Sequence, residues 1–292
     1  MRSSVHQSVL PVEVLQYLDP KPGEIWVDAT TGAGGHAALI AGRIAPDGQL
    51  IALDQDAGML ELAKARFEGL PGLPPHCVPA NFDQLVGVLD RLKLTHVDGV
   101  LADLGICSDQ LDDAQRGFSF QKDAPLDMRL DPTIGASAAD LIANCGEVEL
   151  ADYFYRYGEE RLSRRVAKKI VEAREIEPIT TTFQLAALVR KCVPASGKID
   201  PSTRVFQGLR IAVNDELGCL ERLLAQLPRL VKSGGRIGII SFHSLEDRIV
   251  KHSLQDEDIW QTLTKKPVQA SPEEISRNPR SRSAKLRTAR RR

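Results

Sequence analysis

Short apolar runs alternate with amphipathic stretches over the first hundred residues. Three of the apolar runs end in an acid, at Asp28, Asp54 and Asp103. We expect strands at 25–28, 49–54, 76–79 and 97–103, and helices at 34–43, 57–68 and from 82 onward. Strands that alternate with helices in this way predict a parallel, doubly wound α/β sheet, whose ligands bind at the carboxyl ends of the strands.

The pattern changes after Asp103. Polar stretches lead into helical periodicity at 138–143, 147–156, 159–175 and 182–192. The sheet pattern resumes with a long helix at about 206–230, a strand at 236–242 and an antiparallel pair at 260–264 and 284–289. We therefore expect a sheet domain formed by residues 1–107 and 211–292, with an all-helical domain inserted at 108–210.

A glycine-rich turn, Asp-Ala-Thr-Thr-Gly-Ala-Gly-Gly-His at 28–36, joins the first strand to the first helix. It matches neither the G-x-G-x-x-G of dinucleotide sites nor the Gly-Lys-Ser/Thr of triphosphate loops. Asp54 lies 20 residues beyond Gly34, where an acid that closes the second strand accepts hydrogen bonds from ribose hydroxyls. An adenosyl ligand without phosphates fits this pattern, and S-adenosylmethionine is the commonest one. The alternative is a tight structural turn without a ligand.

Composition agrees with a large α/β domain that carries an insertion. The chain has 292 residues, of which 42% are apolar, enough for a sizeable core. No run of 18 apolar residues and no apolar leader is present, so we expect a soluble, cytoplasmic protein. Its five cysteines are scattered without a C-x-x-C pair, which favours reduced thiols over a zinc site.

Charge is distributed unevenly, although the net charge is only −1. Residues 277–292 contain eight Lys or Arg and no acid, which leaves 30 bases and 39 acids, or −9, in the rest of the chain. A second basic stripe lies on the helix expected at 159–175 and comprises Arg161, Arg164, Arg165, Lys168 and Lys169. Both segments have two interpretations: a solvated surface, disordered in the case of the tail, or a contact with nucleic-acid phosphates.

Several motifs together carry a resemblance to one family. They are His6-x-Ser8-Val9-Leu10, Asp28-x-Thr30-x-Gly32-x-Gly34-Gly35-His36, Asp54-x-Asp56, Asp103-Leu104-Gly105, Gln110-Leu111-Asp112, Arg116-Gly117-Phe118-Ser119-Phe120, Pro125-Leu126-Asp127-Met128-Arg129, Thr203-Arg204-Val205-Phe206-Gln207, and the runs 241–248 and 278–283. The chain thereby resembles, from residue 6 to about 287, the bacterial methyltransferases that modify the exocyclic N4 of a cytidine in the decoding centre of small-subunit (16S) ribosomal RNA.

The resemblance implies a class I S-adenosylmethionine-dependent methyltransferase, Rossmann-like in its sheet, with an inserted helical domain. It implies cofactor contacts at Gly34, Gly35, His36, Asp54, Phe82, Asp103 and Gln110. It also implies that small-subunit ribosomal RNA, as a late assembly particle or the small subunit, is the partner. Cys107 departs from the family, which usually has Ser there, and Cys is the weaker hydrogen-bond donor.

Asp103 is the candidate catalytic residue. At the end of the fourth strand it is placed either to accept N–H groups of the target amine or to bind the methionine ammonium, and the sequence does not separate these roles. His243 either reaches the site or is a structural residue bonded to Asp247. Phe118, Phe120 and Arg129 either hold a flipped nucleotide or pack the inserted domain. We expect no metal, because the acids between 109 and 127 lack a metal-binding spacing.

Three other functions stay open at this point. A non-catalytic ribosome-assembly factor could use the cofactor as a conformational ligand. A methyltransferase of small molecules is disfavoured by the basic tail and stripe, and a nicotinamide dehydrogenase by the missing third glycine. The sequence leaves the oligomeric state open, including a homodimer.

Overall fold

The computed structural model describes residues 7–194 and 200–292. The chain divides into two compact units. The sheet unit comprises the residues up to Cys107 and those from Leu217 onward, and the helical unit comprises Ser108–Glu216. Each unit is described by itself below.

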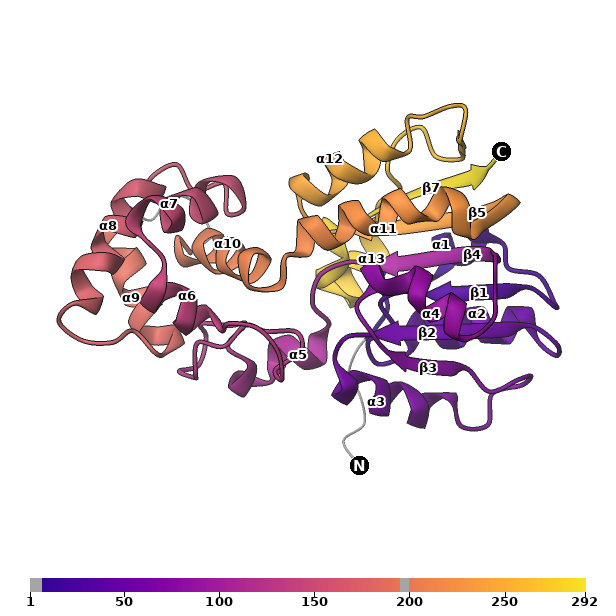
Figure 1. The fold of residues 1–292 in the computed structure, drawn as a ribbon, viewed down its shortest axis with the longest axis horizontal. Helices are drawn as coiled ribbons and strands as arrows, with labels where there is room; N and C mark the ends of the chain where they lie inside the picture. The colour runs from indigo at the N-terminus through magenta and orange to yellow at the C-terminus, as the bar shows by residue number, and fades with distance from the viewer. Residues whose placement is uncertain (1–6, 195–199) are drawn as a thin grey trace. The chain divides into compact units, whose positions relative to one another are not determined.

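The sheet unit is built on seven strands within the described residues. Their order is β3 (His76–Pro79), β2 (Gln49–Asp54), β1 (Ile25–Asp28), β4 (Val97–Asp103), β5 (Val231–Ser241), β7 (Lys285–Arg291) and β6 (Trp260–Thr262). Figure 1 labels all of these strands except β6. The strands from β3 to β5 are parallel, and β7 runs antiparallel to both β5 and β6. The predicted α/β sheet is confirmed, and its first half has the order of a doubly wound fold.

Helices cover both faces of this sheet, because its strands are apolar on both sides. The helices α1 (Pro11–Leu18), α2 (Gly35–Ile44) and α3 (Ala57–Phe67) bury one core with residues such as Trp26 and Leu50. The helices α4 (Leu85–Arg91), α11 (Glu216–Leu230) and α12 (Ser244–Ser253) bury the other, with residues such as Val27 and Ile51. Neighbouring residues of one strand therefore belong to opposite cores, as the pleat requires. No helix in the described ranges is long and apolar enough to cross a membrane.

The basic C-terminal segment is part of the sheet. Between β5 and β7 the register pairs Arg236 with Arg290 and Ser241 with Lys285. Arg287 donates to both carboxylate oxygens of Asp247, at 2.7 and 3.3 Å, and Arg290 donates to the Gly234 carbonyl at 3.0 Å. The interpretation of this segment as a disordered tail is therefore wrong, since its arginines anchor a strand.

The helical unit has its own core. Its helices are α5 (Ser108–Asp112), α6 (Ala138–Asn144), α7 (Glu147–Arg156), α8 (Ser163–Arg174), α9 (Thr182–Cys192) and α10 (Ser202–Asn214). Phe154, Val166, Leu185 and Leu209 are fully or almost fully buried and lie on α7, α8, α9 and α10 respectively. Each of these helices thus presents an apolar stripe to the interior.

The single helix expected at 206–230 is two helices. Asp215 ends α10 with a left-handed backbone (φ 47°), and α11 begins at the next residue. Apolar residues recur at helical spacing through both helices, so the hydrophobic pattern does not indicate the break between them. Arg210 spans it by donating to both oxygens of Glu216 at 2.8 and 2.9 Å. The domain boundary expected near residue 210 consequently falls inside α10.

The contact between Gly99 and Trp26 provides a test of core packing. A Cβ added to Gly99 would overlap the indole ring of the buried Trp26 on the adjacent strand. We expect Gly99→Ala to lower the free energy of unfolding by about 1–3 kcal/mol, as overpacking does. Gly87→Ala is the control: this exposed helical position has open space around it, and Ala there should stabilise by about 0.5–1 kcal/mol. Urea unfolding measures both, and equal effects would contradict the packing argument.

Candidate active site

Three acids meet at the carboxyl edge of adjacent strands. Asp28, Asp54 and Asp103 are the last residues of β1, β2 and β4, and β1 lies between the other two. Burial, together with the charge of Asp54, raises the pKa of Asp28 to about 7. Burial likewise raises the pKa of Asp103 well above its usual value, with added repulsion from Asp28 and Glu246. The edge therefore contains two carboxyl groups that hold their protons unusually tightly.

The glycine-rich turn is fixed to this edge by hydrogen bonds. Thr31 N donates to the Leu53 carbonyl at 2.7 Å, and Gly32 N donates to Asp54 Oδ2 at 2.7 Å. Gly34 precedes α2 with φ +81°, and a Cβ there would press on Phe67 and Ala63. Glycine is thus required at this position both for its backbone conformation and for helix packing. The turn keeps a fixed shape with its backbone close to the strand ends.

Asp103 and His36 lie together. Asp103 N donates to Thr30 Oγ1 at 2.5 Å, which ties the end of β4 to the turn. His36 Nε2 lies 3.7 Å from Asp103 Oδ2, and both side chains are largely buried. Asp103 Oδ1 is buried and has no hydrogen-bond partner among the described residues, as is also true of Asp28 Oδ2. A buried acceptor without a hydrogen bond raises the free energy of the folded state, so a ligand that supplies an N–H or O–H donor would be stabilised here.

The remaining residues that the sequence predicts for the cofactor site lie on other elements. Gly35 begins α2, and Phe82 opens a short 3₁₀ helix (Phe82–Gln84) after β3, where it is half-buried against the core. Gln110 is buried in α5 of the helical unit, so its role in the site stays a prediction. The Cys107 thiol lies 3.3 Å from the Met59 sulfur.

His243 is a helix cap. It is the N-cap of α12, where its ring accepts from Glu246 N at 3.4 Å. Glu246 in return accepts from Phe242 N at 2.8 Å and His243 N at 3.3 Å. The expected partner Asp247 instead pairs with Arg287. The structural role expected for His243 is thus found, but its partner is Glu246, because His is an unusual N-cap and its capping role was not anticipated.

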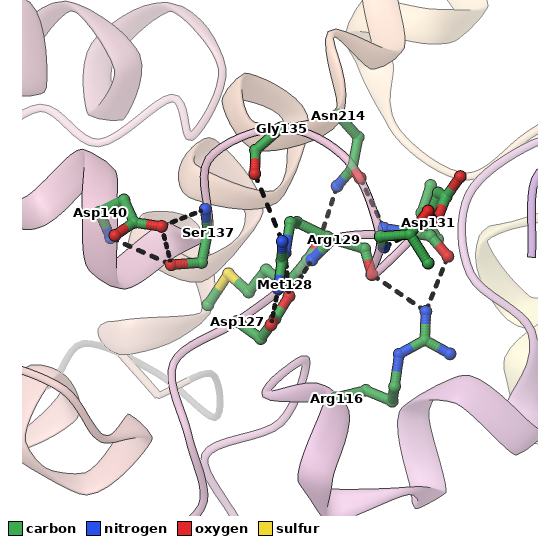
Figure 2. Close-up of polar contacts among 11 residues, drawn as sticks. Arg116, Asp127, Met128, Arg129, Asp131, Gly135, Ser137, Asp140 and Asn214 are labelled. Carbon is green, nitrogen blue, oxygen red and sulfur yellow. Dashed lines mark hydrogen bonds and ion pairs between the residues drawn. The ribbon is translucent and has the colours of Figure 1, made fainter.

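The segment that contains Arg129 is internally hydrogen-bonded in the helical unit (Figure 2). Arg129 donates from Nε and Nη2 to the two oxygens of Asp127, at 2.9 and 2.7 Å, and holds the pKa of that carboxyl below its usual value. Asn214 donates to the Met128 carbonyl at 2.8 Å and accepts from Leu130 N at 2.7 Å. Arg129 therefore orders a loop, and its guanidinium is already engaged.

The two phenylalanines of the same unit differ. Phe118 is 7% exposed, with the Arg116 guanidinium 5.7 Å from its ring centre, and belongs to the core. Phe120 is less buried and packs edge-on against Phe206, with ring centres 4.9 Å apart. Packing of the helical unit thus accounts for Phe118 fully.

Thr30, Glu246 and Asn214 organise these sites and were not predicted. Thr30 connects two strand ends, Glu246 receives two backbone donors, and Asn214 connects α10 to a loop 84 residues away. Only Glu246 had a signal, the three-residue spacing from the helix start. The other two depend on tertiary contacts that sequence spacing does not encode.

The chemistry of the sheet edge suits a cationic ligand with N–H donors. Three carboxyl groups and one imidazole converge there, and two buried carboxylate oxygens lack donors among the described residues. Comparison with known proteins agrees with this chemistry. The model of the MraW methylase family matches residues 3–292. The chain belongs to this family.

Its relatives are similar over nearly their whole length. A protein of Cyanothece sp. named ribosomal RNA small subunit methyltransferase H is 50% identical over 288 residues, covering 98% of this chain and 95% of the relative. A Synechocystis sp. protein of the same name is 48% identical over 291 residues, covering 97% and 92%.

Comparison of structures bears on the fold alone. The crystal structure of PH0851 aligns with 97% of this chain and 45% of its own, at 14% identity and a TM-score of 0.51. Membership of the MraW methylase family confirms the predicted methyltransferase class and its cofactor, S-adenosylmethionine.

The buried Asp28 predicts a pH-dependent stability. Its pKa of about 7 exceeds the usual 3.8, so the folded state binds this proton more tightly than the unfolded chain does. Asp28 therefore lowers the wild-type free energy of unfolding progressively as the pH rises from about 4 to about 7. We expect the free energy of unfolding of Asp28→Asn to exceed that of wild type by up to about 4 kcal/mol at pH 8 and to differ little from it at pH 4. The figure follows from the raised pKa of Asp28, since one pKa unit corresponds to about 1.4 kcal/mol. Urea unfolding across this range measures the gain, and a pH-independent difference would refute the assignment.

Proposed function

We propose that this methylase transfers a methyl group from S-adenosylmethionine to the exocyclic N4 of a cytidine in the decoding centre of small-subunit ribosomal RNA. The observation that carries the proposal is Asp103 Oδ1, a buried acceptor at the end of β4 that lacks a donor among the described residues. The relatives' printed name supports the RNA substrate. The motifs shared with cytosine-N4 methyltransferases support the target atom.

The residues at the sheet edge fit the cofactor. Gly34, Gly35 and His36 would hold its methionine end, Asp54 its ribose hydroxyls, and Phe82 would pack near its adenine. Gln110 lies in α5 of the helical unit, and its cofactor contact is proposed on the family resemblance alone. When bound, S-adenosylmethionine supplies an electrophilic methyl group on a sulfonium. Negative charge at the edge suits both this sulfonium and the neighbouring ammonium.

Asp103 is the proposed catalytic residue. The lone pair of an exocyclic cytosine amine is delocalised into the ring, so an acceptor for its N–H groups would increase the nucleophilicity of the nitrogen. A carboxyl whose pKa is raised by burial takes up a proton more readily than an exposed one. His36, 3.7 Å away, would orient it. The competing role of Asp103 is to bind the methionine ammonium.

Nucleoside mass spectrometry tests the function directly. Small-subunit RNA and small subunits from cells that lack this protein would be incubated with purified protein and methyl-labelled S-adenosylmethionine. Label in N4-methylcytidine supports the proposal. Label in another nucleoside would overturn the target atom. Absence of label in both substrates, with RNA association retained, would favour the non-catalytic assembly factor.

Substitution of Asp103 separates its two roles. We expect Asp103→Ala to lower kcat by at least about 100-fold, the effect of removing one positioned polar group from an active site. Asp103→Asn, which keeps the size and one acceptor oxygen, should retain more activity. If Asp103 binds the ammonium, the loss would lie in KM for the cofactor instead. Asp47→Ala is the control, because Asp47 is an exposed acid in the turn before β2. Full turnover by Asp103→Ala would remove both roles.

A further inference from the structure

The most concentrated charge on the helical unit lies on α8. Its basic face, as we define it, consists of Arg161 in the preceding turn and Arg164, Arg165, Lys168 and Lys169 on the helix. All five side chains are exposed, while Ser163, Val166, Ala167 and Ile170 bury the opposite side. No acid interrupts the sequence from 161 to 171. The face therefore carries up to five positive charges, and Arg164 to Lys169 spans roughly 7.5 Å of helix axis.

Helix stability does not explain this arrangement. Arg164 and Arg165 lie in the first turn, where the helix dipole favours acids, and the first acid, Glu172, comes near the other end. Arg164 and Lys168 are four positions apart, as are Arg165 and Lys169, and like charges at this spacing repel. The order of charges is thus unfavourable for an isolated helix in two respects: its interaction with the helix dipole and the repulsion between like charges four positions apart. The stability of the isolated helix therefore does not account for the face.

Four of the five cations of the basic face have no acidic partner in the part of the chain that the structure describes. Lys169 lies 3.3 Å from Glu172, but the other four make no hydrogen bond or ion pair within the described ranges. Arginines elsewhere in the unit are engaged: Arg174, on the same helix, donates to the Ile142 and Cys145 carbonyls at 2.6 and 2.7 Å, and Arg190 pairs with Asp200. Arg174 and Arg190 therefore have structural roles, whereas the cations of the basic face point into solvent.

We propose that the basic face of α8 binds the phosphate backbone of small-subunit ribosomal RNA and so holds the substrate on the helical unit. The inference rests on the proposed function and deepens it by naming the surface that contacts the RNA. Closely spaced cations without acids complement a polymer that carries one charge per nucleotide. Arginine adds a planar fork of donors suited to phosphate.

The charge of the rest of the unit makes the face distinctive. Residues 108–216 contain 15 bases and 18 acids, so the unit as a whole is net −3. Five of those bases are gathered on one face, which excludes a generally basic surface as the explanation. An acidic protein would also complement the charge. RNA is favoured because the relatives' name specifies an RNA substrate and because backbone recognition needs charge density without apolar contacts.

A triple variant, Arg164→Gln, Arg165→Gln and Lys168→Gln, tests the proposal through the salt dependence of binding. Binding to small-subunit RNA and to small subunits, both from cells lacking the protein, would be measured without methyl donor from low to high salt. We expect the slope of log K against log salt to fall by about 2, at about 0.7–0.9 per phosphate contact, and low-salt affinity to fall at least tenfold. In methylation assays KM for RNA should rise, with kcat and cofactor affinity unchanged.

Matched variants separate this role from others. Lys251→Gln, Lys265→Gln and Lys266→Gln remove three exposed charges from the sheet unit and should leave the slope near that of wild type. Arg164→Lys with Arg165→Lys keeps the charge and should keep most of the slope. The glutamine variant removes repelling charges, so its melting temperature should not fall.

A wild-type slope in the glutamine variant, or an equal loss in the sheet-unit control, would overturn the proposal. Loss of binding to small subunits but not to RNA would overturn it in favour of an acidic protein partner. Failure of wild type to methylate cytidine would instead refute the proposed function, and the binding measurements would still decide the role of the basic face.

Discussion

The burial of Asp28 at the end of β1 is the constraint on which the site depends. Its Oδ1 accepts from Thr30 N at 3.2 Å, and its carbonyl accepts from the Thr31 hydroxyl at 3.2 Å. Thr30 in turn receives the backbone N–H of Asp103, so the first strand, the turn and the fourth strand form one hydrogen-bonded assembly. A buried carboxyl destabilises the fold when it ionises. The carboxyl end of a parallel strand is a suitable place for such a group, because a ligand that binds there can offset the cost of its burial.

The sheet edge could be predicted because its signals are local. Each apolar strand ends in an acid, and the G-x-G-G turn sits between a strand and a helix, so the sequence alone identified the strand ends at Asp28, Asp54 and Asp103. The parallel arrangement of these strands followed from their alternation with helices. What could not be predicted is how the pieces are joined, since the bond from Asp103 N to Thr30 joins residues 73 positions apart.

Errors in the prediction have three physical causes. The break at Asp215 lies inside a continuous apolar period, and a left-handed residue leaves no trace in that period. His243 caps α12 through Glu246, whereas Asp247 was the expected partner, because capping preferences favour Ser, Thr, Asp and Asn over His. The basic C-terminus was open to a disordered interpretation because charge alone does not reveal that Arg287 pairs with the partly buried Asp247, 40 positions away.

The electrostatics of the two units pose a problem that a methylase of RNA must solve. A polyanion has to reach a site lined by acids, and fully ionised carboxylates would repel it. Burial reduces this repulsion, because it raises the pKa of Asp28 to about 7 and the pKa of Asp103 well above its usual value, which disfavours the charged form of both carboxyl groups. The cations proposed to attract RNA belong to the other compact unit, on a helix whose own stability they reduce. The proposed catalytic carboxyl and the proposed phosphate contacts thus come from different parts of the chain, so the acids of the sheet edge need not contribute to the attraction of the RNA.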